Sequence, residues 1–220
     1  NVRVIENDFT MAVYSEGALN VRQAQGGALI NQLRIQNNRI VLTDASVANY
    51  TRAAIQVEAA GAGHMILDNY ISTNNPAIRY SCEAVSGAPS GDLDGLRVEG
   101  NVIENPYKGF ELVGPFMVRD GVHVSNNTMR TVEDGIILLS AAPFSSIGGN
   151  KISCRPLGAR DNGVIATGIP ARTIGIGASN PGSDQLAVNG NELFNCNYGI
   201  DLGTDASGAA VANPPVRATI

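Results

Sequence analysis

The sequence is poor in aromatic residues and in cysteine. It has no Trp, aromatic residues make up 5% of its 220 residues, and it holds three cysteines. So few aromatic residues exclude a core built on large rings. An odd number of cysteines without metal-type spacing excludes a complete disulfide framework. We therefore predict that Cys82, Cys154 and Cys196 are mostly buried thiols.

Charge and long apolar runs are also scarce. Charged residues make up 16% of the chain and the formal net charge is -5. This argues against a nucleic-acid partner, because phosphates require a concentrated basic surface. No apolar stretch is long enough to span a bilayer, and the N-terminus shows no signal-peptide pattern. We expect no membrane insertion, and the immediate start of an apolar-alternating segment suggests a piece of a longer chain.

What the sequence does contain is a repeated unit. The unit reads apolar, any residue, apolar, two further residues, Asn, any residue and usually an apolar residue, as in "LRIQNNRI" and "LRVEGNVI". The repeated Asn residues are Asn7, Asn38, Asn69, Asn101, Asn127, Asn150 and Asn191. Their intervals are 31, 31, 32, 26, 23 and 41 residues, so the shortest repeat has about 23 residues and the longer ones carry loops.

A second unit follows each Asn. It consists of a small residue, an apolar one, a variable one and usually another apolar one. The seven segments are "ALNV" at 18, "AIQV" at 54, "AIRY" at 77, "GFEL" at 109, "GIIL" at 135, "GVIA" at 163 and "GIDL" at 199. Alternation with period two, together with Gly and Asn punctuation, predicts short strands and excludes helices.

The two units together predict an all-β fold, a single-stranded right-handed parallel β-helix of about seven coils with loop insertions. It should span residues 1–203, and 204–220 should form a C-terminal tail or linker. Apolar residues would stack in columns about 4.8 Å apart, and each Asn would adopt left-handed backbone angles and bond to the next Asn as a ladder. His64 takes an inward position and should have a buried polar partner.

A leucine-rich repeat is the main alternative, because its signature also places Asn after alternating aliphatic residues. That signature requires a further Leu three positions before the first apolar residue. Only Ile30 and Leu93 satisfy this requirement. The pattern instead resembles the right-handed parallel β-helix (pectin-lyase-like) superfamily, which includes pectate lyases and phage tailspikes, over residues 2 to 202. The resemblance implies the fold more than an activity, because that scaffold hosts lyases, hydrolases, epimerases and adhesins.

Two columns of outward side chains follow from the repeat. The first column is Arg3, Arg34, Met65, Arg97, His123, Ser146 and Ala187. The second column is Asn20, Gln56, Arg79, Glu111, Ile137, Ile165 and Asp201. The basic first column either offers a track for an acidic polysaccharide or is a solvated face with local carboxylate partners such as Glu99.

Four residues are candidates for catalysis. The segment "TVEDGIIL" places Glu133 and Asp134 at a turn one coil beyond Glu111, and a glycosidase needs two nearby carboxylates. Asp before Gly is also ordinary turn chemistry. A lyase would instead use His123 as a base, with Arg97 on the next coil neutralising a uronate. A lone His is more often a structural hydrogen-bond partner.

The predicted substrate-binding residues are Arg79, Arg97, Tyr107, Tyr198 and Asp201. The two tyrosines would offer platforms for sugar rings, and the alternative is that they cap the turn before the second strand.

No cofactor or metal site is predicted. The only candidate calcium ligands are Asp92 and Asp94 in "SGDLDG", and two carboxylates without a third ligand are weak support for a site.

These patterns lead us to expect an extracellular or virion-associated protein that binds a polysaccharide and is able to degrade it, as a glycoside hydrolase or lyase of tailspike type. The absence of cap segments at either end suggests a homotrimer or part of a larger chain. A non-catalytic carbohydrate-binding or adhesive module and a structural spacer of a virion or secretion apparatus remain the alternatives.

Overall fold

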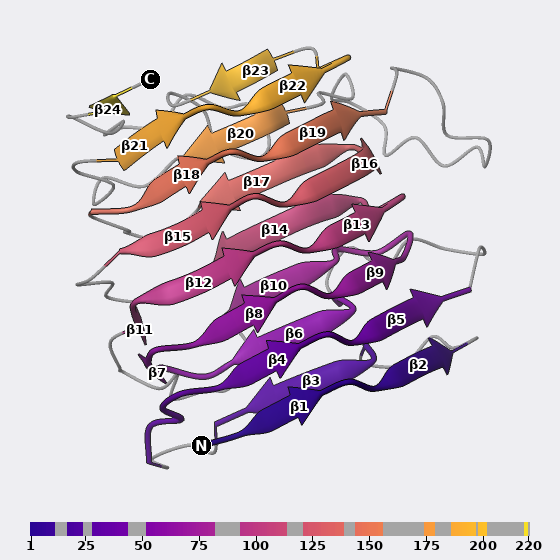
Figure 1. Cartoon of the computed structure of the whole chain (residues 1–220), viewed down its shortest axis with the longest axis vertical. Coiled ribbons are helices and arrows are strands. Elements are labelled where there is room, and N and C mark those ends of the chain that lie inside the picture. Colours follow the sequence, from indigo (N-terminus) through magenta and orange to yellow (C-terminus); the bar gives the residue numbers. More distant parts are fainter. Residues whose placement is uncertain are drawn as a thin grey trace.

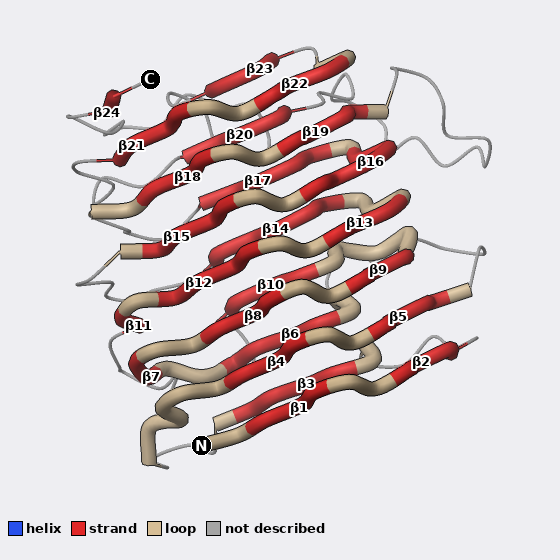
Figure 2. Tube along the Cα trace, viewed as in Figure 1, coloured by secondary structure: helices blue, strands red, loops and turns tan. Residues whose placement is uncertain are grey.

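The computed structural model describes residues 1–11, 17–23, 28–43, 52–81, 93–113, 121–138, 144–155, 174–178, 186–196, 198–201 and 218–219. Every regular element in these ranges is a β-strand, as the red segments of Figure 2 show. Within them, no helix is available to cross a membrane.

The strands form three large parallel sheets, which we name A, B and C. Sheet A consists of β1 (Arg3–Ile5), β4 (Arg34–Gln36), β8 (Met65–Leu67), β12 (Leu96–Glu99), β15 (Val122–Ser125), β18 (Ser146–Gly148), β21 (Leu186–Asn189) and β24 (Ala218–Thr219). Sheet B consists of β2 (Asp8–Met11), β5 (Arg39–Leu42), β9 (Tyr70–Ser72), β13 (Val102–Glu104), β16 (Thr128–Val132), β19 (Lys151–Cys154) and β22 (Glu192–Phe194). Sheet C consists of β3 (Leu19–Arg22), β6 (Ile55–Glu58), β10 (Ile78–Ser81), β14 (Lys108–Val113), β17 (Asp134–Leu138), β20 (Ile174–Ala178) and β23 (Tyr198–Asp201). A small fourth sheet pairs β7 (Gly61–Ala62) with β11 (Leu93–Asp94).

The chain visits the three large sheets in a fixed order. It passes through a strand of sheet A, then sheet B, then sheet C, and returns to sheet A beside the strand it left. In Figure 1 sheets A and B lie on the front of the molecule and sheet C lies behind them. This all-β stack of parallel strands is compatible with a parallel β-helix.

Apolar side chains stack inside the three sheets in register. In sheet A the inward column contains Ile35, Ile66, Val98, Val124, Ile147 and Val188, all of which are buried. Full burial of one such side chain contributes about 1.5–3 kcal/mol. The predicted stacking of aliphatic residues is therefore confirmed, and the core runs along the whole described stack.

The seven repeated Asn residues form the predicted ladder between sheets A and B. The Asn69 backbone N–H and side-chain amide both donate to Asn101 Oδ1 at 3.0 Å, and Asn101 donates in the same way to Asn127. The same bonds join every successive pair from Asn7 to Asn191. The ladder satisfies polar groups that the bend between the two sheets would otherwise leave buried and unpaired.

The left-handed backbone angles fall one residue before the position we predicted. The residues directly before the ladder all have positive φ, whereas the ladder Asn residues do not; the former are Glu6, Asn37, Asp68, Gly100, Asn126, Gly149 and Gly190. Asn, Asp and Gly tolerate this conformation, so they fill six of the seven positions. The sequence did not separate the two roles, because an Asn suits either the bend or the ladder.

The predicted sixth segment of sheet C is wrong. We placed it at 163 with Ile165 pointing outward, but β20 begins at Ile174 and Gly177 takes that register position, beside Ile137 and Asp201. The segments "GVIA" and "GIGA" both fit the pattern of small and apolar residues. Pairing with β17 distinguishes them, and Ile165 itself lies outside the described residues.

The cysteines also differ from the prediction. Cys154 and Cys196 form a disulfide rather than buried thiols, with 5.0 Å between their Cα atoms. Cys154 ends β19, and Cys196 follows β22, the neighbouring strand of sheet B. The stacking brings them together although 42 residues separate them in sequence, which sequence spacing alone does not reveal. Cys82 lies outside the described residues.

The sequence placed His64 at an inward position with a buried polar partner. His64 is fully buried, as predicted, and its ring contacts the Ile30 carbonyl oxygen through Nε2 and the Tyr80 hydroxyl through Nδ1. Burial lowers the pKa of His64 and raises that of Tyr80.

At the C-terminus, Ala218–Thr219 pairs with β21, so these two residues join sheet A although we predicted a tail or linker over 204–220.

Candidate functional site

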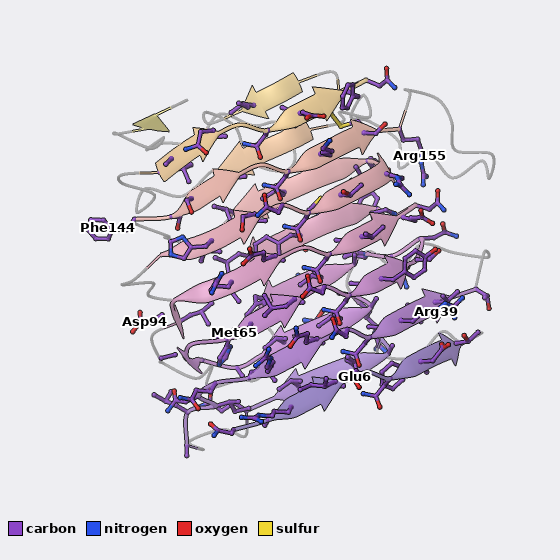
Figure 3. The ribbon with its side chains drawn as sticks, viewed as in Figure 1. Glu6, Arg39, Met65, Asp94, Phe144 and Arg155 are labelled. Carbon is purple, nitrogen blue, oxygen red and sulfur yellow. A yellow bond between two sulfur atoms is a disulfide. The ribbon has the colours of Figure 1, made fainter. Side chains whose placement is uncertain are left out.

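The predicted site residues lie on the outward faces of two different sheets. Arg79, Glu111 and Asp134 belong to sheet C, whereas Arg97 and His123 belong to sheet A. Figure 3 shows the side chains of sheets A and B on the front of the molecule, with Met65 and Arg39 labelled on the two sheets. The two groups of residues therefore form separate candidate sites.

The group on sheet C is a buried cluster of charges. Arg79 and Glu111 are neighbours in register, and Arg79 Nε lies 3.2 Å from Glu111 Oε2. The Lys108 ammonium contacts the other oxygen of Glu111. The Glu111 side chain is 3% exposed, and those of Arg79 and Lys108 are 10% and 14% exposed. Glu111 thus has a cation against each carboxylate oxygen.

Asp134 and Tyr107 border this cluster. Asp134 is buried and lies beside Lys108 in the register of β14 and β17. The Lys108 ammonium lies 5.7 Å from the centre of the Tyr107 ring, within the range of a cation–π interaction. Glu133 is half-buried in the turn before β17. Because Lys108 already lies near the Tyr107 ring, the structure agrees better with Tyr107 as a cap of the turn than as a platform for a sugar ring.

The cluster continues as a polar strip toward the N-terminal strands of sheet C. Gln56 lies in register with Arg79, and its side-chain amide donates to Ser81 Oγ at 2.8 Å. Glu58, beside Gln56 on β6, forms an ion pair of 2.8 Å with Arg22. Gln56, Glu58 and Ser81 are all buried. The outward face of sheet C therefore holds charges that neutralise one another away from water.

The group on sheet A is an open row. Arg3, Arg34, Met65, Arg97, His123, Ser146 and Ala187 follow one another in register, which confirms the predicted column. Arg3 and Arg97 are exposed, and Arg34, Met65 and His123 are half-buried. The row is therefore accessible from the front of the molecule.

The partners within this row are few and short-range. His123 Nδ1 lies 2.8 Å from Ser146 Oγ, and Arg97 forms an ion pair of 2.5 Å with Glu99 on its own strand. Arg34 Nε donates to Gln36 Oε1 at 2.7 Å. Within the described ranges, no carboxylate pairs with Arg3 or Arg34. Arg97 therefore has a local carboxylate partner, as expected for a solvated face. Arg3 and Arg34 have none among the described residues.

The outward face of sheet B provides a contrast on the same side of the molecule. Arg39 pairs with Asp8 at 3.1 Å, and Arg130 pairs with Glu104 at 2.8 Å. The Tyr70 hydroxyl donates to Glu104 Oε2 at 2.8 Å. This hydrogen bond raises the pKa of Tyr70, and together with Arg130 it lowers the pKa of Glu104. Both arginines in the described strands of this sheet are therefore neutralised.

The side chains of three predicted residues lie outside the described part of the chain. Tyr198 and Asp201 lie in β23, at the register positions of Ile174 and Gly177, and their side chains are outside the described part of the chain. Of the two calcium candidates, Asp92 is also outside it, and Asp94 ends β11. Among the described side chains, no three His, Cys, Asp or Glu residues gather as a metal site would require.

Sequence reasoning missed two members of these groups. Lys108 contacts Glu111, and its position three residues before Glu111 on a predicted strand was the available signal. Ser146 was placed in the outward column without a role, although it lies one strand from His123. No family model, curated protein or solved structure matches the chain.

Proposed function

We propose that this protein binds an acidic polysaccharide along the outward face of sheet A. In this proposal the stack is a right-handed parallel β-helix of seven coils, of the kind to which the pectin-lyase-like superfamily belongs. The observation that carries the proposal is the open row in which Arg3 and Arg34 lie side by side without a carboxylate partner among the described residues. Like charges directly opposite one another on a sheet are destabilising, so a bound anion would relieve their repulsion.

The geometry of the row suits an extended polymer. Neighbouring strands of a sheet lie about 4.8 Å apart, so the row offers a contact at each step along the stack. A guanidinium binds carboxylate and sulfate groups through two parallel hydrogen bonds. The low overall basicity of the chain favours this local site over binding to nucleic acid, since the net charge is -5.

The buried cluster of sheet C supports the choice of sheet A. Glu111 already has a cation at each oxygen and its side chain is 3% exposed, so a substrate has no access to it in this arrangement. The same contacts argue for a structural role for Arg79 and Lys108. The catalytic roles predicted for Glu111, Glu133 and Asp134 remain predictions.

The disulfide supports an extracellular location. Disulfides persist in oxidising compartments and are rare in the cytosol, and Cys154–Cys196 joins neighbouring strands of sheet B. Most free polysaccharides are encountered outside the cell or at its surface. We therefore keep the extracellular or virion-associated location as part of the proposal.

A binding experiment with two matched variants tests the proposal. Affinities of the full chain for acidic and neutral polysaccharides are measured by calorimetry at low and high salt. We expect preferential binding of the acidic polymers that weakens with salt, and a loss of about three- to fivefold for Arg34→Gln. Arg130→Gln, which removes an arginine neutralised by Glu104 on sheet B, is the control and should leave binding unchanged.

The proposal fails if acidic polymers bind no better than neutral ones. It also fails if Arg130→Gln reduces affinity as much as Arg34→Gln, because binding would then follow total charge rather than the row. Retention on no polysaccharide at all would favour the structural spacer.

Cleavage of the same polymer is a second candidate, favoured by the position of His123 between Arg97 and Ser146 in register. In a β-elimination the imidazole would take the proton from C5 of a uronate held by Arg97. The C–H electron pair would form the C4–C5 double bond, and the C4–O4 bond would break as the leaving oxygen takes up a proton. Formation of the unsaturated product, followed by its ultraviolet absorbance, tests this.

Elimination with His123 as the base predicts that His123→Gln lowers the rate by about 10²–10⁴-fold and leaves binding intact. Absence of unsaturated product from every acidic polymer that binds would leave a non-catalytic binding or adhesive module.

A further inference from the structure

The row on sheet A is interrupted by an apolar strand. β8 is the third strand of the sheet, between Arg34 on β4 and Arg97 on β12. Its inward residue, Ile66, is buried like its neighbours in the core column. Its two outward residues, Met65 and Leu67, are both apolar and half-buried, and Figure 3 shows Met65 on the front face.

This apolar step differs from the strands on either side of it. The outward pair on β4 is Arg34 and Gln36, and the outward pair on β12 is Arg97 and Glu99. Both flanking pairs are held in place, by the bond from Arg34 to Gln36 and by the ion pair of Arg97 with Glu99. Two oriented arginines therefore stand two strands apart, about 10 Å, with a methionine and a leucine between them.

From this arrangement we propose that the bound polymer carries its anionic groups on alternate sugars, so that an uncharged sugar lies over Met65 and Leu67. This inference rests on the proposed function and specifies its ligand. One pyranose residue advances a polymer by a distance close to one strand spacing. Carboxylates or sulfates on every second sugar would then meet Arg34 and Arg97 together. The anion at Arg34 would also face Arg3 on the adjoining strand, and so would relieve the repulsion between these two arginines.

A polymer charged on every sugar fits less well. It would place one carboxylate against the two apolar side chains of β8, where that anion would lose hydration without gaining a partner. An uncharged sugar has C–H groups that pack favourably on apolar side chains. Met65 therefore acts as a specificity residue, because it disfavours an anion between the two that Arg34 and Arg97 bind.

The test compares polymers of equal length with the full chain. A polymer that alternates a uronate with an uncharged N-acetylhexosamine, a homopolymer of uronate and a neutral polymer are titrated at one salt concentration. We expect the alternating polymer to bind about three- to fivefold more tightly than the homopolymer. Met65→Arg should abolish or reverse that preference by tightening the homopolymer alone.

Val102→Arg provides the matched control. Val102 is a half-buried outward apolar residue of sheet B, so this variant adds the same charge to the same side of the molecule away from the row. It should leave the preference unchanged. The thermal unfolding of both variants is compared with that of the parent, and outward positions should tolerate the change.

The possible results separate the two proposals. Equal affinity for both acidic polymers, or a stronger preference for the homopolymer, would overturn the alternating pattern and leave acidic-polymer binding standing. Equal effects of Met65→Arg and Val102→Arg would overturn the role of Met65. Binding of all three polymers with the same affinity would end both proposals at once.

Discussion

The outward faces of sheets C and A carry similar residue types in opposite environments. On sheet C, Arg79 and Glu111 are buried, Lys108 is half-buried, and their charges neutralise one another. On sheet A, Arg3 and Arg34 lie on an accessible face without a carboxylate partner in the described part of the chain. Both faces arise from the same repeat, so burial, and not residue type, decides whether a charged residue stabilises the fold or is available for binding.

The first prediction concerns one carboxylate from each face. Glu111→Gln leaves the buried Arg79 and the half-buried Lys108 without their counter-charge, so we expect the free energy of unfolding to fall by about 3–5 kcal/mol. Glu99→Gln on sheet A removes an exposed ion pair with Arg97, and its cost should be at most about 1 kcal/mol. Urea unfolding of the two variants measures the difference. Equal costs would contradict the role given to burial.

The ladder extends the comparison to uncharged groups. Asn101→Ala in the centre of the stack removes the acceptor of two bonds from Asn69 in a fully buried site. We expect a loss of about 2–4 kcal/mol, because buried donors are left unpaired. Asn7→Ala at the exposed first step should cost less than about 1 kcal/mol. Urea unfolding again provides the values, and a larger loss for Asn7 would refute the argument.

The buried His64 extends the comparison to the pH dependence of stability. Burial lowers the pKa of His64 in the folded protein below its ordinary value of 6.5. The unfolded chain then binds the proton more readily, so the contribution of His64 is complete above about pH 6.5 and is lost as the pH falls below it. Melting temperatures between pH 5 and 8 should show this decline in the parent and in His123→Gln. The decline should be smaller in His64→Gln, and an identical slope in all three would count against it.

The smallest effect should come from a site where the backbone alone matters. Glu6 has a φ of 61° at the bend before the ladder, where the other repeats have Asn, Asp or Gly. Glu6→Asn should raise the free energy of unfolding by about 0.5 kcal/mol, because Asn adopts this conformation more easily. Glu6→Ala removes the same carboxylate without that tolerance and is the control. Stabilisation by both variants would point to charge rather than backbone conformation.

The sequence predicted the stacked strands, the Asn ladder and the outward column of sheet A. Each depends on residues that recur at a fixed place in the repeat, so the pattern is visible without knowledge of the fold. The position of β20 was not predictable, because "GVIA" and "GIGA" are equally suitable and only pairing with β17 chooses between them. The two candidate sites were predicted in part, since the repeat identified outward positions but not which of them are covered.

By itself the sequence determined that like residues lie above one another, since apolar alternation and the recurring Asn impose that order on each repeat. The tertiary structure alone decided that Cys154 meets Cys196 and that Glu111 is enclosed between two cations. Distances across a stack depend on the lengths of the intervening loops and on what covers each face. The local pattern of a single repeat encodes neither these distances nor the cover of each face, because both arise only when the strands of successive repeats stack.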